Sequence, residues 1–280
     1  MSRRLGEIHA HAFLTGASTG LGRAFAEMLL AEGVRVWGTA RDVARLTELA
    51  AKFPAAFTPV ALDLGDPEAA ERAFARAANS AGGSFDVVVN NAGFGVFSEF
   101  AETDFAVWQS QIDRMLVTTL RLAHAGVRGM RRRGRGCLVN VSSLATDFPL
   151  PFMSGYNVAK AGLSALSESL IVELHGTGIT VVDFRPGDYR TEFNQAMSSL
   201  SPVATAPSPR VRRAWLRLEQ NLLAAPRPER AADDLRRALG RGRGGVVRSG
   251  GFFQAKLAPL FARCAPAAVM RAARARYFGL

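Results

Sequence analysis

The chain has 280 residues, of which 48% are apolar, and a formal net charge of +11. This length allows one large α/β domain or two small ones, and the apolar content is enough for a full core. Two cysteines, Cys137 and Cys264, argue against a disulfide framework or a thiolate metal site and suit a reducing, cytoplasmic compartment. We expect no signal peptide, because no apolar segment follows Arg3 and Arg4, and no run approaches the roughly 18 apolar residues of a membrane span.

Much of the excess positive charge is arginine, in the runs 131–135, 241–243 and 271–276. A nucleic-acid-binding protein would gather this charge on one face with aromatic residues between the basic ones. Here the arginines are scattered over predicted helix ends and loops. We therefore interpret them as solvated surface and expect no nucleic-acid partner.

The first predicted unit is a strand, a glycine-rich turn and a helix. Residues 11–15 indicate a short buried strand, and an amphipathic helix follows to about Glu32. The turn between them reads Gly16-Ala-Ser-Thr-Gly20-Leu-Gly22. Glycines let the backbone approach a pyrophosphate closely, and the start of the helix offers it free N–H groups. The position of the turn between a strand and a helix therefore favours a nucleotide site.

The end of the second predicted strand, residues 34–39, bears on the choice of cofactor. A cofactor with a free ribose 2′-hydroxyl requires Asp or Glu about 20 residues beyond the glycines. The chain has Ala40 and Arg41 there, followed by Asp42. An arginine suits a 2′-phosphate, so we predict NADP(H) in preference to NAD(H). The alternative is that Arg41 merely caps the edge of the sheet.

Strands and helices alternate through the next part of the chain. We predict strands at 57–62, 85–89, 136–141 and 179–184, helices at 43–52, 67–81 and 154–175, and a long bent helical region at 103–133. This alternation predicts an α/β fold, a Rossmann-like doubly wound parallel sheet with helices on both faces. Since there is no internal repeat and no second-domain boundary, we expect a single domain over residues 1–280.

The pattern loosens after residue 190. Residues 191–230 include a stretch rich in Ser, Pro and Ala and fit a mobile substrate lid. A helix at 231–239 and a last strand at 245–248 follow. Residues 252–280 form a basic, amphipathic C-terminal extension, which we interpret as a subunit interface or a pocket cover in preference to a helix on a membrane surface.

The stretch 139–160 carries the candidate chemistry. A strand ends at Ser142 and Ser143, and a helix then places Tyr156 and Lys160 one turn apart on one face. An ammonium beneath a phenol favours the phenolate, so we expect the pKa of Tyr156 to fall. Together with a serine hydroxyl, the pair could polarise a carbonyl and exchange a proton with its oxygen. The same spacing is also met by a surface tyrosine near a solvated lysine.

Two further predicted strand ends carry polar residues. Asp63 lies where open α/β sheets place ligands and could accept a hydrogen bond from an adenine amino group. Asp66 before Pro67 instead indicates a helix N-cap. Asn90-Asn-Ala-Gly93 has amide and small side chains, which leave room for the adenosine half of a nucleotide.

Together these segments resemble the classical short-chain dehydrogenase/reductase superfamily over about residues 12–191. The segments that match in order and spacing are Thr15-Gly-Ala-Ser-Thr-Gly-Leu-Gly22, Asp63, Asn90-Asn-Ala-Gly93, Val139-Asn-Val-Ser-Ser143, Tyr156-x-x-x-Lys160, and Pro186-Gly187 with Thr191. The resemblance implies a seven-stranded parallel sheet with a nicotinamide cofactor lying across it. It also implies assembly into homodimers or homotetramers.

The resemblance further implies a role for each matching residue. Tyr156 is the acid/base, Lys160 lowers its pKa and holds the nicotinamide ribose, and Ser143 steadies the carbonyl oxygen. The residues implied to hold the cofactor phosphates are Gly16, Ser18, Thr19, Gly20, Leu21 and Gly22. Those implied to hold the rest of the cofactor are Arg41, Asp63, Leu64, Asn91, Ala92, Gly93, Pro186, Gly187 and Thr191.

Met115 departs from the family pattern. It aligns with an asparagine that keeps the long helix bent and anchors a water relaying protons to the lysine. A thioether cannot replace an amide in a hydrogen-bonded relay. Three explanations stay open: the relay is rebuilt through other water, turnover is slow, or the chain is not chiefly a catalyst. Asp188 is also uncommon at its position, and the sequence offers no explanation for it.

We expect an NADP(H)-dependent ketoreductase that interconverts a carbonyl and a secondary alcohol, with a hydride from nicotinamide and a proton from Tyr156. The residues expected at the pocket rim are Phe94, Ala145, Phe148, Phe152, Met153, Tyr189 and Phe193. Their character predicts a bulky apolar substrate, steroid-like, retinoid-like or acyl, and we expect no metal. One alternative is a non-catalytic NADP(H)-binding sensor or scaffold. Another is a glycine-loop methyltransferase, against which Arg41 and Tyr156 count.

Overall fold

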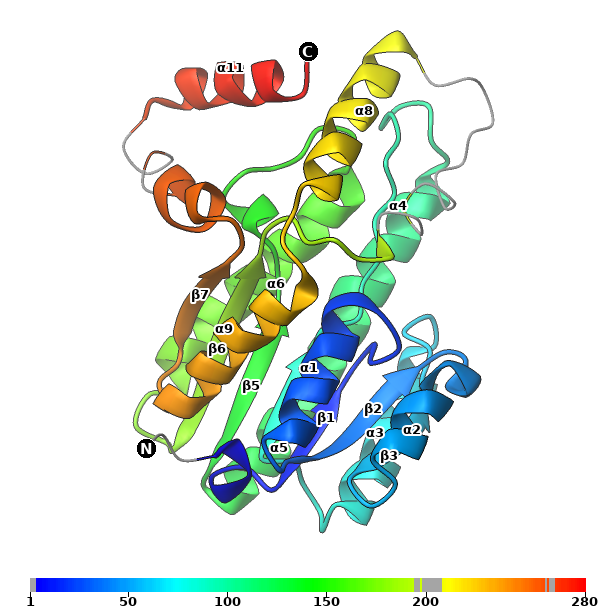
Figure 1. Ribbon diagram of the computed structural model, residues 1–280, viewed down its shortest axis with the longest axis vertical. Helices are drawn as coiled ribbons and strands as arrows, with labels where there is room; N and C mark the ends of the chain where they lie inside the picture. Colours follow the sequence, from blue (N-terminus) through cyan, green and yellow to red (C-terminus); the bar gives the residue numbers. More distant parts are fainter. Residues whose placement is uncertain (1–3, 194–196, 198–207, 260, 262–264) are drawn as a thin grey trace.

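The computed structural model describes residues 4–193, 197, 208–259, 261 and 265–280. One sheet of parallel strands forms its centre, in the order β3-β2-β1-β4-β5-β6-β7 (Figure 1). The strands are β1 (His11–Leu14), β2 (Arg35–Ala40), β3 (Phe57–Ala61), β4 (Val87–Asn90), β5 (Gly136–Val141), β6 (Ile179–Pro186) and β7 (Gly245–Ser249). The predicted Rossmann-like sheet is confirmed.

Helices connect the strands and cover the sheet. The longer helices are α1 (Gly20–Ala31), α2 (Thr47–Lys52), α3 (Pro67–Ser80), α4 (Phe105–Ile112), α5 (Thr118–Arg133), α6 (Ser154–Glu173), α8 (Pro209–Leu223), α9 (Pro228–Arg241) and α11 (Ala267–Tyr277). The short helical segments are η1 (Leu5–Glu7), η2 (Val43–Leu46), η3 (Asp113–Val117), η4 (Leu144–Thr146) and η5 (Phe253–Leu257). None of the helices in these described ranges is long and apolar enough to cross a membrane.

The strand order places a ligand cleft at the middle of the sheet. β1 pairs with β2 on one side, with Leu14 opposite Gly38, and with β4 on the other, with Leu14 opposite Val89. The chain therefore runs outward from β1 in one direction and returns to start in the other direction at β4. Such a switch point opens a crevice at the carboxyl ends of the strands, where α/β sheets bind ligands.

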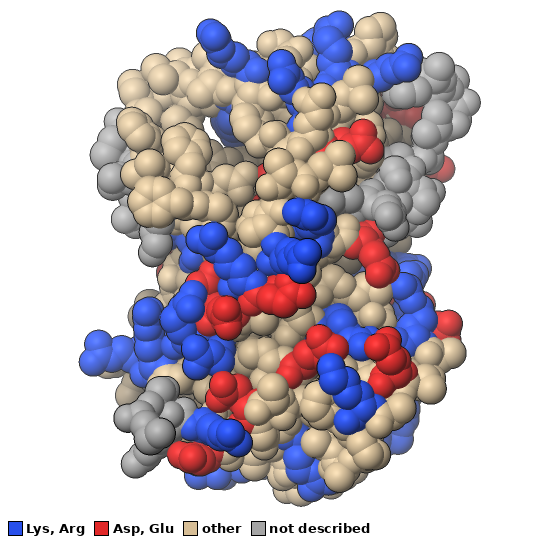
Figure 2. Space-filling view, in the orientation of Figure 1, with Lys and Arg blue, Asp and Glu red and all other residues tan. Residues whose placement is uncertain are grey.

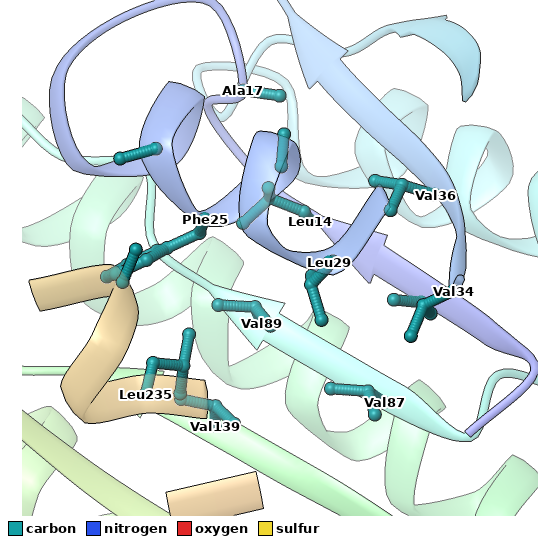
Figure 3. Packing of buried hydrophobic residues seen from close by; sticks show 14 of the residues in the cluster. Leu14, Ala17, Phe25, Leu29, Val34, Val36, Val87, Val89, Val139 and Leu235 are labelled. Carbon is teal, nitrogen blue, oxygen red and sulfur yellow. The ribbon is translucent and has the colours of Figure 1, made fainter. Parts of the chain in front are cut away.

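Apolar side chains bury both faces of the sheet. On one face, α1, α2 and α9 pack against the strands around Phe25, Leu29 and Leu235, and Figure 3 shows these side chains over Val89 and Val139. On the other face, side chains of α3, α5 and α6 form a second cluster. The strands read as nearly continuous apolar runs because both of their faces are covered.

The described part of the predicted lid over residues 191–230 is largely the helix α8. The hydroxyl of Ser208 accepts a hydrogen bond from the N–H of Val211 at 3.4 Å, and Pro209 occupies the first turn. Buried residues recur at the helical period: Val211, Ala214, Leu218 and Leu222. The rest of the predicted lid, 194–196 and 198–207, lies outside the described residues.

A third apolar cluster lies beyond the carboxyl ends of the strands. It joins Phe97, Met153 and Phe278 to the buried side chains of α8. Figure 1 shows α8 and α11 above the strand ends, with η5 leading from β7 towards α11. These elements form a cap, defined here as α8, η5 and α11, over the cleft.

Charged side chains of both signs are interspersed on the lower part of the face in Figure 2, which covers the sheet and its helices. The upper part, over the cap, is mainly uncharged with basic side chains at its rim. On this face the positive charge is therefore dispersed, as expected for solvated arginines.

Candidate active site

A single large cleft of about 1960 Å³ follows the carboxyl ends of the strands in the described part of the chain. Its floor comes from the segments after β1 to β6, and its upper wall comes from the cap. The predicted cofactor residues all line it: Gly16, Ser18, Thr19, Gly20, Leu21, Gly22, Arg41, Asp63, Leu64, Asn91, Ala92, Gly93, Tyr156, Lys160, Pro186, Gly187 and Thr191. The fold thus brings together in one cleft segments as far apart along the chain as residues 16 and 278.

The turn after β1 fits a phosphate. A Cβ on Gly22 would lie 1.9 Å from the carbonyl oxygen of Gly16, so only glycine allows helix α1 to start this close to the turn. Gly16 itself has φ +71°, which L side chains rarely adopt. Thr19 precedes α1 without capping it through its side chain, so the first N–H groups of the helix are open to an anion.

Asn91 braces this turn from β4. Its side-chain amide donates to the carbonyl oxygens of Thr15 at 2.9 Å and Gly16 at 3.3 Å, and its backbone N–H donates to the Thr15 hydroxyl at 2.9 Å. The side-chain amide of Asn91 is therefore fixed by hydrogen bonds to the backbone of the turn. This geometry fits a residue that fixes the shape of the phosphate turn as well as lining the cleft.

Two arginines line the adenosine end of the cleft. Arg41 follows β2 and is exposed, and Arg45 in η2 forms an ion pair with Glu192 at 3.2 Å. One carboxylate oxygen of Asp42 accepts the N–H of Ala44 at 3.0 Å. Asp63 accepts the N–H of Gly65 at 2.9 Å and keeps its side chain about half exposed to the cleft. Asp66 caps α3 as predicted, by accepting the N–H of Ala69 at 2.9 Å.

Ser143, Tyr156 and Lys160 meet in the middle of the cleft. Ser143 ends the segment after β5, and its hydroxyl accepts the N–H of Ala145 at 3.0 Å and lies close enough to the phenol of Tyr156 to lower its pKa. Lys160 lies one turn along α6, 5% exposed, with Nζ 5.8 Å from the centroid of the Tyr156 ring. Its ammonium donates to the carbonyl oxygen of Val141 at 2.7 Å.

The protonation of this set differs from the sequence prediction. Burial raises the pKa of Tyr156, the hydrogen bond from Ser143 opposes the rise, and the negative charge of Asp188 adds to it. Burial also lowers the pKa of Lys160 to about 8, against the opposing effect of Asp183. The expected fall in the pKa of Tyr156 is wrong for the protein alone, because the ammonium is directed to a backbone carbonyl and desolvation outweighs it.

Met115 lies in the wall of this site, 1% exposed, on the π-helical turn η3 between α4 and α5. Its sulfur accepts the N–H of Phe94 at 3.2 Å. A Cβ on Gly93 would lie 3.3 Å from this sulfur and 3.5 Å from Nζ of Lys160, so all three groups converge. The long helical region is thus interrupted here by a π-helical turn, although the residue is methionine and not the asparagine of the family pattern. The methionine sulfur accepts one backbone N–H.

A buried ionic network lies beneath Lys160. Asp183, fully buried on β6, accepts from Ser164 at 2.6 Å and from Arg185 at 2.8 Å, and it also bonds to the hydroxyl of Ser142. Arg185 in turn pairs with Asp147 at 2.9 Å. Ser142 is therefore part of the support beneath the strand end, and Ser143 is the serine that faces Tyr156.

The predicted pocket rim is largely in place, with one correction. The predicted rim residues that line the cleft are Phe94, Ala145, Phe148, Met153, Tyr189 and Phe193. Phe152 does not line it and packs against Phe97 at a centroid distance of 5.5 Å. Tyr189 lies deep at the edge, 3% exposed, with its hydroxyl 2.5 Å from that of Ser249.

The sequence did not predict the individual cleft residues of the cap. They include Leu218 and Leu222 of α8, Gln254 of the η5 segment, and Met270 and Tyr277 of α11. The buried period of α8 and its Ser-Pro start could have been found in the sequence. The contacts of η5 and α11 depend on how the chain returns over the cleft, for which no local signal exists.

A family model described as short chain dehydrogenase matches residues 10–200 of the chain. Among curated proteins, the serine 3-dehydrogenase of Agrobacterium fabrum is 35% identical over 181 residues, which cover 64% of this chain and 72% of that protein. The 3-oxoacyl-[acyl-carrier-protein] reductase FabG of Vibrio harveyi is 30% identical over 194 residues, which cover 69% and 79%.

Solved structures agree with this relationship. A short-chain dehydrogenase from Streptomyces avermitilis superposes with a TM-score of 0.77 and 29% identity, covering 95% of this chain and 94% of that one. A metagenomic short-chain oxidoreductase in complex with NADP has a TM-score of 0.67 and 29% identity, with coverages of 85% and 96%. The chain therefore belongs to the short-chain dehydrogenase family and is an oxidoreductase that acts on CH–OH and C=O groups.

Proposed function

We propose that this oxidoreductase interconverts a ketone and a secondary alcohol on a fairly bulky apolar substrate, with NADP(H) as its cofactor and Tyr156 as its acid/base. The observation that carries the proposal is that the Ser143 hydroxyl and the Tyr156 phenol both line the cleft that the glycine turn opens into, close enough for the hydroxyl to lower the pKa of the phenol. A substrate oxygen placed between these two hydroxyls would be held by both of them.

In this mechanism each of the three residues has a distinct task. A bound nicotinamide would supply or take up the hydride. Tyr156 would give its proton to the carbonyl oxygen as the alcohol forms, and Ser143 would donate a hydrogen bond to the same oxygen, which lowers the energy of the charge developing there. Lys160 would bind the nicotinamide ribose and place a positive charge beneath Tyr156.

The preference for NADP(H) is supported by the charges at the adenosine end of the cleft. Arg41 and Arg45 line it, and the neighbouring Asp42 is turned to its own backbone. Guanidinium groups bind phosphates through charge-assisted hydrogen bonds.

The apolar substrate is supported by the cleft walls. Phenylalanine and methionine side chains from the sheet side face aromatic and aliphatic side chains of the cap across the cleft. A steroid-like, retinoid-like or acyl ketone would bury its surface there.

We also propose a homodimer or homotetramer in the cytoplasm. Exposed apolar side chains on the outer helices support an assembly: Phe105 on α4 is 65% exposed, Leu120 on α5 is 42% exposed, and Val158 and Val172 on α6 are 53% and 75% exposed. Such side chains are usually covered in an assembly.

The test is consumption of NADPH with a panel of apolar ketones by the parent protein and by Tyr156→Phe. We expect the variant to lose about 10²- to 10⁴-fold of its turnover and to bind NADPH as the parent does. Full activity in the variant would reject Tyr156 as the acid.

A second candidate function is a non-catalytic NADP(H)-binding sensor, favoured by the apolar Met115 beside Lys160. It predicts that the parent binds NADPH but turns over no ketone. Met115→Asn then separates the two functions, because turnover that appears only in this variant would show that the parent lacks a proton relay.

A further inference from the structure

The carboxyl group of Asp188 lines the cleft and has no role in the proposed mechanism. It follows Gly187 after β6, is half-buried, and lines the cleft. Its charge is one of the causes that raise the pKa of Tyr156, so it lies within electrostatic reach of the reacting phenol. The position is therefore suited to contact a substrate whose carbonyl is held by Tyr156.

The partners of Asp188 leave much of its capacity unused. The side-chain amide of Gln254 donates to Oδ2 at 2.6 Å, and the backbone N–H of Asp188 donates back to Gln254 at 3.4 Å. Within the described ranges, Gln254 is the only residue that donates to this carboxyl group. A carboxylate can accept about four hydrogen bonds, so Oδ1 is free to accept from a ligand.

Three other aspartates of low exposure form ion pairs with arginines. Asp86 pairs with Arg133 at 2.9 Å, Asp147 with Arg185 at 2.9 Å, and Asp183 with Arg185 at 2.8 Å. Among the side chains that the structure describes, which do not include that of Lys256, no arginine, lysine or histidine forms an ion pair with Asp188. A carboxyl group without a cation in a largely apolar cleft is unfavourable, and burial correspondingly raises its pKa. Such an arrangement is typical of a ligand site.

The surroundings of Asp188 define the shape of a matching ligand. The hydroxyl of Tyr277 on α11 lies close enough to Gln254 and to Asn221 of α8 for both to lower its pKa, so this polar cluster spans the cap. Around it the cleft wall is apolar, with Phe253, Phe261 and Met270. A ligand that lies against this wall would meet the carboxyl group of Asp188 together with these apolar side chains.

We propose that Asp188 binds a hydrogen-bond-donor group of the substrate, a hydroxyl or an ammonium, on an otherwise apolar ketone or alcohol. This inference rests on the proposed ketoreductase function. It narrows the substrate class to hydroxy ketones or amino ketones in which the donor group lies near the carbonyl. Asp188 is then a specificity-determining residue, and its hydrogen bond with Gln254 ties η5 to this side of the cleft.

The experiment compares ketones of one carbon skeleton that differ in a single group next to the carbonyl: hydrogen, hydroxyl or amino. For the parent we expect kcat/KM to be about 10- to 100-fold higher with the hydroxy or amino ketone than with the plain ketone, as for a hydrogen bond to a charged group. The better of the two identifies the donor. Asp188→Asn should bring this ratio to within about threefold of one.

Two control variants separate recognition from mere support of the cap. Asp66→Asn makes the same chemical change at an exposed helix cap, where Asn also caps well, and should keep the parent ratio. Gln254→Ala removes the tie between η5 and Asp188 but leaves the carboxyl group, so the preference for the donor-bearing ketone should survive. If Asp188 only anchors η5, Asp188→Asn and Gln254→Ala will lower stability alike and neither will change the ratio.

The outcomes distinguish this inference from the proposed function. Turnover of plain ketones at the same kcat/KM as their hydroxy and amino counterparts would overturn the role of Asp188 and leave the ketoreductase function standing. If no ketone is turned over, the proposed function fails, and calorimetric binding of the matching diol, amino alcohol and plain alcohol decides the role of Asp188. Equal binding of the three by the parent would overturn it.

Discussion

Replacement of Lys160 by methionine should make the protein more stable at pH 7 while abolishing its activity. Lys160 is 5% exposed, and burial lowers its pKa to about 8 from 10.5. The unfolded chain therefore binds the lysine proton more tightly than the folded chain does. The resulting destabilisation of the folded state has its full size below about pH 8 and decreases as the pH rises towards 10.5.

The size of the effect follows from these two values. At pH 7 the lowered pKa corresponds to roughly 3 kcal/mol of unfavourable free energy. Methionine also loses the hydrogen bond from Nζ to Val141, worth about 1 kcal/mol. We therefore expect Lys160→Met to raise the free energy of unfolding by about 2 kcal/mol at pH 7, and by less than about 1 kcal/mol at pH 10.

The measurement is urea denaturation of the parent and the variant, without nucleotide, at pH 7 and pH 10. Lys52→Met is the control, because Lys52 is 59% exposed, with a 3.7 Å ion pair to Glu27 and its Nζ 5.5 Å from the centroid of the Phe53 ring; its change should stay within about 0.5 kcal/mol. A Lys160→Met protein that is clearly less stable than the parent at pH 7 would refute the reasoning. It would mean that the folded chain stabilises the ammonium.

Three further substitutions test other parts of the site. Arg41→Ala should weaken NADPH binding about 10- to 100-fold and leave NADH binding nearly unchanged in a fluorescence titration; an equal loss for both would contradict the 2′-phosphate assignment. Met115→Leu should lower the free energy of unfolding by about 1–2 kcal/mol, since the N–H of Phe94 loses its sulfur acceptor; an unchanged urea midpoint would show that this contact contributes nothing. Asp183→Asn should lower it by about 3 kcal/mol, because Arg185 loses a fully buried partner; a loss under 1 kcal/mol would show that Asp147 and Glu168 together satisfy Arg185.

The sheet and the floor of the cleft could be predicted because their signals are local. Buried parallel strands read as apolar runs, and the Gly16-to-Gly22 turn is required by a contact between neighbours in sequence. The strand ends then meet at one edge of the sheet wherever the chain is parallel. Knowledge of the strand positions therefore placed Asp63 and Tyr156 in one cleft.

A cover over the cleft from residues 252–280 was among the predictions, but the contacts of the cap and the protonation states could not be predicted because they depend on contacts across the fold. Gln254 meets Asp188 only because η5 follows β7 and turns over the cleft. The i to i+4 spacing of Tyr156 and Lys160 was read correctly, but the sign of the shift in the pKa of Tyr156 depends on desolvation by the whole cleft. Phe152 was assigned to the pocket from its character alone, whereas its backbone, with φ 63°, turns its ring towards Phe97.

The low pKa of Lys160 also predicts how nucleotide binding should depend on pH. Its ammonium has a backbone carbonyl at 2.7 Å and the sulfur of Met115 nearby, and neither is a carboxylate. A ribose hydroxyl and the phosphates of a nucleotide would favour the charged lysine, so binding should raise its pKa above about 8. Affinity for NADPH should then be highest below pH 8 and fall above it, because binding takes up a proton there. Titrations at pH 7 and pH 9 test this, and a fall that persists in Lys160→Met would assign it to another group.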